Sequence, residues 1–72
     1  MYNFVMNNNA QTNGDHEVHN LSNGCSFLPN TENQLSLGYH SDCKGAVSFA
    51  KNKWPSARIN GCYYCCNSCH TS

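Results

Sequence analysis

The cysteines near the end of the chain are the residues best suited to chemistry. Residues 62–70 read Cys-Tyr-Tyr-Cys-Cys-Asn-Ser-Cys-His, which is two CxxC units laid end to end and closed by a histidine. A CxxC pair suits zinc, because a tight turn brings both sulfurs to about 2.3 Å from one ion while backbone N–H groups offset the thiolate charge. No loop separates the two units, so they cannot wrap one ion as a zinc ribbon does. The spacing favours a tetrahedral site with one CxxC pair from this tail, completed by Cys43, Cys25 or His70.

A structural zinc site is the leading hypothesis for these residues. Its cofactor is zinc, and its candidate metal ligands are Cys62, Cys65, Cys66, Cys69, Cys43 and Cys25. Disulfide bonds are the second hypothesis, because an even number of cysteines in a short chain leaves many pairings open. The sequence does not start with a basic segment and a long apolar run, so we expect no secretory signal and a cytoplasmic protein. A reducing cytosol keeps thiols free, which favours zinc over disulfides.

Two further kinds of chemistry use the same sulfurs. Residues 66–70 have the CxxCH pattern of c-type haem attachment, in which two thiols form thioethers and the histidine ligates iron. The competing Cys65, the terminal position and the missing export signal disfavour this interpretation. Cys43 lies near an expected helix start, a setting that lowers a thiol pKa, so a thiol-redox or metal-handling enzyme is the rival function. Redox CxxC pairs usually open a helix in a larger α/β domain, and we therefore favour a non-enzymatic protein.

Other polar residues carry weaker signals. His16 and His19 form an HxxH that could hold a transition metal from one helical face, but a solvated pair beside an Asn-rich segment is the favoured interpretation. All four acidic residues lie within 15–42 and all four basic residues within 44–58. The basic stretch is compatible with an anionic partner, yet a solvated helix face explains four charges as well.

Size and composition limit the function classes. The chain has 72 residues, including six cysteines and twelve asparagines, with 11% charged residues and a formal net charge of zero. That balance argues against a polybasic nucleic-acid binder, and no apolar run approaches the ~20 residues of a membrane span. A domain this small has a marginal core, so we expect a metal or disulfide staple, and a homodimer is another way to add buried area. The expected function is a small module that binds a protein partner.

One helix is expected to present a cysteine to the core. Five apolar residues recur at helical spacing between Cys43 and Trp54, which places Cys43 on the inward face. Ser41 is the expected N-cap, and Pro55 cannot continue the helix. The pattern predicts an amphipathic helix over about 41–54.

The tail cysteines are expected to follow a hairpin. Asn60-Gly61 lies between two short apolar runs, and this pair favours a type I′ turn, so we predict a hairpin over about 56–66. The alternative for the tail is a helix, since its four cysteines also lie at helical spacing. The predicted fold is a small cysteine-rich α+β domain in which the helix packs on the hairpin.

The start of the chain is expected to lie outside this domain. Tyr2–Met6 alternates in a way that fits a short strand, but Asn7–Asp15 has no apolar period. We therefore predict a flexible Asn-rich segment over 1–24 and a single cysteine-rich domain over 25–72. Within that domain, Asn30 is expected to cap a single helical turn that runs to Leu37.

The tail also carries a resemblance. Residues 61–72, with their GCxxCCxxCH pattern, and residues 37–43 resemble small bacterial proteins of the kind carried on mobile gene cassettes. The resemblance implies a bacterial and cytoplasmic origin. It transfers no activity and no site residue.

Overall fold

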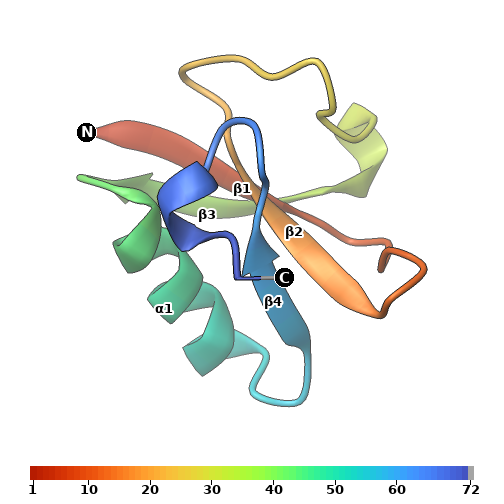
Figure 1. Ribbon diagram of the computed structural model, residues 1–72. Coiled ribbons are helices and arrows are strands. Elements are labelled where there is room, and N and C mark those ends of the chain that lie inside the picture. The colour runs from red at the N-terminus through yellow and green to blue at the C-terminus, as the bar shows by residue number, and fades with distance from the viewer. Residues whose placement is uncertain (72) are drawn as a thin grey trace.

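The computed structural model describes residues 1–71 as a small, cysteine-rich α+β fold, as the sequence predicted. Figure 1 shows one helix packed against a twisted sheet. The elements are strands β1 (Tyr2–Asn7), β2 (Asp15–Asn20), β3 (Gln34–His40) and β4 (Arg58–Gly61), the helix α1 (Cys43–Lys53), and the 3-10 turns η1 (Thr31–Asn33) and η2 (Asn67–Cys69). Within residues 1–71, no helix has the length and apolar character that a membrane span requires.

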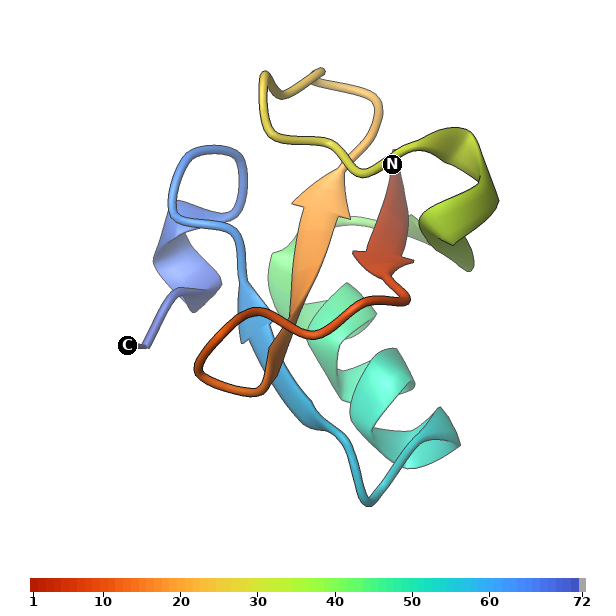
Figure 2. The same ribbon diagram turned by 90° about the vertical axis from the view of Figure 1, so that its right-hand side faces the viewer.

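The sheet is mixed, with the order β3-β1-β2-β4. β1 pairs antiparallel with both β2 and β3, whereas β4 pairs parallel with β2. α1 lies across one face, as the two views in Figures 1 and 2 show. The side chains between them form the core, whose buried members are Phe4, Met6, Val18, Leu37, Cys43, Ala46, Ala50, Cys62 and Cys66.

α1 confirms the predicted helix, with a different cap. The Asp42 carboxylate accepts a hydrogen bond from the Gly45 N–H at 3.2 Å, so Asp42 is the N-cap that we expected Ser41 to be. Trp54 ends the helix, and its N–H donates to the Ala50 carbonyl. Cys43 lies on the buried face, as the periodicity predicted.

The predicted hairpin over about 56–66 is only partly matched. A strand does form at 58–61, but it pairs with β2, and Asn60-Gly61 lies inside it instead of forming a turn. The Asn60 side-chain oxygen accepts hydrogen bonds from the Thr71 N–H and hydroxyl, which keeps Asn60 in the strand. A Cβ on Gly61 would come within 2.7 Å of the Cys66 carbonyl oxygen, so the glycine allows the tail to fold back onto β4. The tail makes a tight turn and then η2, and is neither a second hairpin strand nor a continuous helix.

The start of the chain differs from the flexible segment expected over 1–24. β1 and β2 are the two central strands, and their side chains supply part of the core. The Asn-rich stretch between them is the connection, in which the Asn13 side chain accepts from the Asp15 N–H and Gly14 adopts a φ of +92°. The polar composition of this Asn-rich stretch therefore fits a turn between two strands. The domain boundary that we expected after residue 24 falls inside one structural unit, because β1 and β2 belong to the same sheet as β3 and β4.

The segment after Asn30 also differs from the prediction. The helical turn that starts there stops at Asn33, and β3 continues through Leu37 to His40. Gly38, with a φ of +80°, lies where the register between β1 and β3 shifts, which is a β-bulge that needs the left-handed conformation of glycine.

Candidate metal centre

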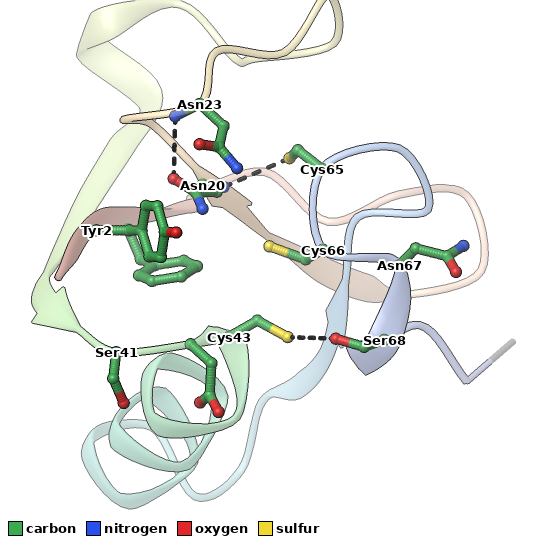
Figure 3. A pocket seen from close by; sticks show the side chains of 11 residues that line it. Tyr2, Asn20, Asn23, Ser41, Cys43, Cys65, Cys66, Asn67 and Ser68 are labelled. Carbon is green, nitrogen blue, oxygen red and sulfur yellow. Dashed lines mark hydrogen bonds between the residues drawn. The ribbon is translucent and has the colours of Figure 1, made fainter.

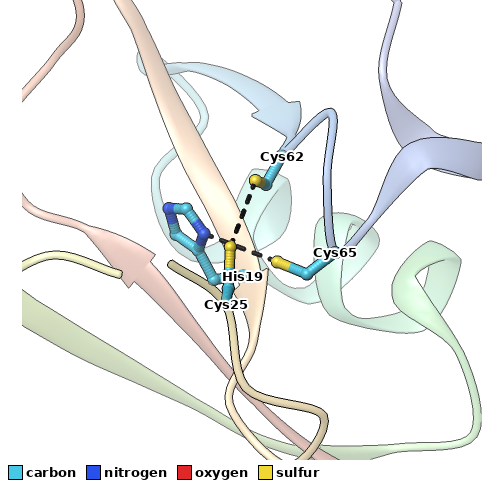
Figure 4. Close-up of side chains that lie close together, drawn as sticks. All are labelled: His19, Cys25, Cys62 and Cys65. Atoms are coloured by element: carbon cyan, nitrogen blue, oxygen red, sulfur yellow. Dashed lines mark hydrogen bonds between the residues drawn. The ribbon is translucent and has the colours of Figure 1, made fainter. Parts of the chain in front are cut away.

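Three segments converge at the carboxyl ends of the parallel strands β2 and β4. The strand register places Val18 beside Gly61, and the residues that follow, His19 and Cys62, therefore lie next to each other. Cys25 comes from the irregular loop after β2, and Cys65 comes from the turn after Cys62. Figure 4 shows these four side chains directed toward one point.

The distances in this cluster fit a tetrahedral ion. The four ligand atoms of His19, Cys25, Cys62 and Cys65 all lie within 4.8 Å of one another. The Sγ atoms of Cys25 and Cys62 are 3.8 Å apart, and His19 Nδ1 is 3.5 Å from Cys65 Sγ. A tetrahedral zinc with ordinary bond lengths requires about 3.8 Å between two sulfurs and about 3.6 Å between a sulfur and a nitrogen. Two of the six distances therefore match those of a tetrahedral ion, and the cluster could hold a metal.

One backbone donor faces a sulfur of the cluster, and two further backbone hydrogen bonds fix the segments that carry the sulfurs. The Asn20 N–H points at Cys65 Sγ over 3.4 Å, and a donor in this position offsets negative charge on the sulfur. The Cys62 N–H donates to the Val18 carbonyl, which fixes Cys62 to the end of β2. The Cys66 N–H donates to the Cys62 carbonyl and closes the turn that carries Cys65.

Burial sets the protonation states of two of the four residues. His19 is 0% exposed, and burial lowers its pKa, so its imidazole is neutral and has a lone pair for a metal. Burial raises the pKa of the Cys65 thiol well above its usual range, with the neighbouring Cys25 and Cys62 thiols adding to the shift. A cation among these sulfurs would favour the thiolate and reverse this effect.

The second ring nitrogen of His19 faces a carboxylate. Among residues 1–71, buried His19 Nε2 has no hydrogen-bond partner, and Glu17 Oε1 lies 3.7 Å from it. Glu17 and His19 are two residues apart on β2 and share one side of the strand. A histidine that ligates a metal usually gives its other N–H to a carboxylate or carbonyl, and Glu17 is the group in place for that role.

Two of the six predicted metal ligands are paired elsewhere. Cys43 and Cys69 form a disulfide, with sulfurs 2.02 Å apart and Cα atoms 6.3 Å apart. The bond joins the first turn of α1 to η2 and leaves neither sulfur for a metal. The CxxCH pattern over residues 66–70 thereby loses one of the two thiols that haem attachment requires.

Cys66 is a free thiol that lies outside the cluster. It is buried, and burial raises its pKa to about 11. Its side chain lines a cavity of about 200 Å³ between η2, the start of α1 and the end of β2, which Figure 3 shows from close by. Polar side chains form much of the wall, among them Asn20, Asn23, Ser41, Asp42 and Ser68.

The structure thus brings together three of the six predicted ligands, Cys25, Cys62 and Cys65, and adds His19. Sequence reasoning missed His19 because it assigned the HxxH to a solvated pair. In β2 the two histidines separate: His16 Nδ1 is 3.0 Å from the Asn7 carbonyl oxygen, while His19 faces the sulfurs. His70, the other histidine considered, has its Nδ1 3.0 Å from the Gly61 carbonyl oxygen.

No protein-family model, curated protein or solved structure matches this chain.

Proposed function

We propose that the protein is a small, non-enzymatic binding module stabilised by one structural zinc ion, which His19, Cys25, Cys62 and Cys65 hold. The observation that carries this proposal is the convergence of four ligand atoms from three segments to within 4.8 Å. The fold places these residues together although 46 positions separate the first from the last.

The donor set favours zinc in a structural role. Three thiolates and one imidazole are a common ligand set for structural zinc, and four protein ligands fill a tetrahedral shell. A catalytic zinc needs an open position for water or substrate, which this set does not leave. The ion would join the loop of Cys25 to the ends of β2 and β4, where the marginal core of a small domain needs support.

Exposed aromatic side chains support the binding part of the proposal. Phe27 follows Cys25 by two residues, while Tyr63 and Tyr64 lie between Cys62 and Cys65, and all three aromatic rings are largely exposed. The rings of Phe27 and Tyr64 stack with centroids 4.4 Å apart. Aromatic residues gathered on a surface are typical of protein interfaces, so we propose a protein as the partner.

The disulfide bears on the compartment that the sequence predicted. We expected a cytoplasmic protein, whereas a disulfide such as Cys43–Cys69 is typical of oxidising compartments.

Native mass spectrometry with two neighbouring substitutions tests the proposal. We expect one zinc per chain, lost on acidification as the thiolates take up protons. Cys65→Ser removes a ligand and should weaken zinc binding more than the ~10–100-fold that loss of an outer partner costs. Cys66→Ser is the matched control, because Cys66 is the adjacent free thiol outside the cluster. Absence of zinc from the native chain, or equal weakening by both substitutions, would contradict the proposal.

A further inference from the structure

Two of the proposed zinc ligands also form a close sulfur pair. Cys25 Sγ and Cys62 Sγ lie 3.8 Å apart, and a disulfide bond is about 2.05 Å long, so bonding requires an approach of under about 2 Å. Cys62 is fixed to β2 through its N–H. Cys25 belongs to an irregular loop, which can supply that movement.

The two sulfurs differ in exposure. Cys62 is 1% exposed, whereas Cys25 is partly exposed. A small reagent from solvent therefore meets Cys25 first, and Cys62 is the neighbouring sulfur that can complete the reaction. This division between a reachable and a resolving sulfur is typical of cysteine pairs that respond to oxidants.

The other four cysteines have different surroundings. Cys43 and Cys69 are already bonded to each other, and Cys66 is buried outside the cluster. The Cys65 sulfur lies 3.5 Å from His19 Nδ1 and 3.4 Å from the Asn20 backbone nitrogen. A bond between Cys25 and Cys62 would remove two of four ligands and leave His19 and Cys65. Two ligands are too few for a structural zinc site.

We infer that Cys25 and Cys62 are an oxidation site for hydrogen peroxide, and that their oxidation to a disulfide releases the bound zinc. This inference rests on the proposed zinc site and names its regulation. Metal-loaded protein with one disulfide and oxidised, metal-free protein with two disulfides are then the two states of the molecule.

The reaction balances with peroxide as the only oxidant. The Cys25 sulfur attacks one peroxide oxygen, the O–O bond breaks, and the products are a sulfenic acid and hydroxide. The Cys62 sulfur then attacks the Cys25 sulfur, the S–S bond forms and the S–O bond breaks, with loss of a second hydroxide. The two sulfurs lose two electrons in total and the peroxide gains them. Two protons from the acid form of the buffer convert both hydroxides to water. Zinc leaves as the divalent ion.

The test is a titration of the zinc-loaded full chain with hydrogen peroxide, with a zinc-binding dye to measure release. We expect one zinc released for each peroxide consumed, and thiol reductant should restore zinc binding. Cleavage after Glu32, Lys44 and Tyr64 places Cys25, Cys43, Cys62 and Cys65 on four different peptides. Mass spectrometry of these peptides should show a new link between Cys25 and Cys62.

A variant outside the cluster is the matched control. Cys66→Ser should bind zinc and release it with peroxide as the native chain does, because Cys66 is not one of the four clustered residues. The peptide map of the native chain then identifies the reacting pair, and a link between Cys25 and Cys62 is the expected result.

The outcomes distinguish this inference from the proposal beneath it. A native chain that carries no zinc before peroxide is added overturns both. A chain that binds zinc but keeps it through one equivalent of peroxide, or forms a Cys62–Cys65 link instead, overturns only the oxidation site.

Discussion

The two ring nitrogens of His19 have different neighbours, and this difference explains how a buried histidine can serve as a ligand. Nδ1 faces the Cys65 sulfur, and Nε2 lies in the protein 3.7 Å from Glu17 Oε1. With zinc on Nδ1, the ring proton lies on Nε2, where the carboxylate can accept it as a hydrogen bond. In the proposed zinc site, Glu17 would therefore be a positioning residue for the His19 ligand.

Substitution of Glu17 tests this role. Glu17→Ala should weaken zinc binding about tenfold, because the histidine loses the group that orients it, while Glu17→Gln retains an oxygen acceptor and should weaken it less. Competition with a chelator measures both. Glu32→Ala, at an exposed glutamate in η1, is the control. Equal affinities for Glu17→Ala and Glu32→Ala would contradict the positioning role.

Cys66 gives the protein a defined response to alkaline pH. Burial raises its folded-state pKa from 9.0 to about 11, so from pH 9.0 upward the unfolded chain loses this proton while the folded protein keeps it. The stabilisation is complete below pH 9.0 and is lost as the pH rises to about 11. The contribution of Cys66 to the free energy of unfolding should fall by up to about 3 kcal/mol over this range. Urea unfolding of Cys66→Ala should show a smaller fall, and an identical pH dependence would contradict the assignment.

Among the elements, the parallel pair of β2 and β4 creates the site. Parallel strands place their carboxyl ends together, and here those ends carry His19 and Cys62. α1 packs across the sheet and contributes no ligand to the cluster, but its first residue, Cys43, holds η2 through the disulfide. The turn that supplies Cys65 is thus fixed before it by the Cys62 hydrogen bond to β2 and after it by the disulfide at Cys69.

The N-cap of α1 provides an element-scale test. Asp42→Ala should lower the free energy of unfolding by about 1 kcal/mol, because the Gly45 N–H loses its acceptor. Ser41→Ala is the matched control and should change it by less than about 0.5 kcal/mol, because Ser41 is not the cap. Chemical denaturation measures both values, and a larger effect at Ser41 would contradict the observed cap.

The same elements show how far sequence reasoning reaches. The helix could be predicted because its periodicity, cap and proline stop are local signals. The Asn60-Gly61 turn was also a local signal, but pairing with β2 and contacts from the tail override it.

The site was predicted only in part, for a related reason. Residue type identified Cys25, Cys62 and Cys65 as candidate ligands. His19 enters the cluster only because β2 pairs with β4, and Cys43 leaves it only because α1 lies against η2. Such long-range contacts carry no local sequence signal.

At the scale of the whole molecule, one disulfide supplements a small core, and the proposed zinc ion would add a second cross-link. The Cys43–Cys69 disulfide has a sequence separation of 26 and removes about 3–4 kcal/mol of chain entropy from the unfolded state. The proposed zinc ion links β2, the Cys25 loop and the tail. The sheet joins the start of the chain to the segments that carry the disulfide and the proposed zinc ion, because β1 and β2 are its central strands.

This arrangement predicts that residues 25–72 cannot fold alone. Their fragment lacks β1 and β2, with the core residues Phe4, Met6 and Val18 and the ligand His19. Circular dichroism during heating should show no cooperative transition for the fragment and a single one for the full chain. A cooperative transition in the fragment would restore the domain boundary expected from the sequence.

The most direct test of the central claim is X-ray absorption at the zinc edge of the metal-loaded protein. The account predicts three sulfur neighbours at about 2.3 Å and one nitrogen neighbour at about 2.0–2.1 Å. Four sulfur neighbours, or fewer than three sulfur neighbours, would contradict a site built from His19, Cys25, Cys62 and Cys65.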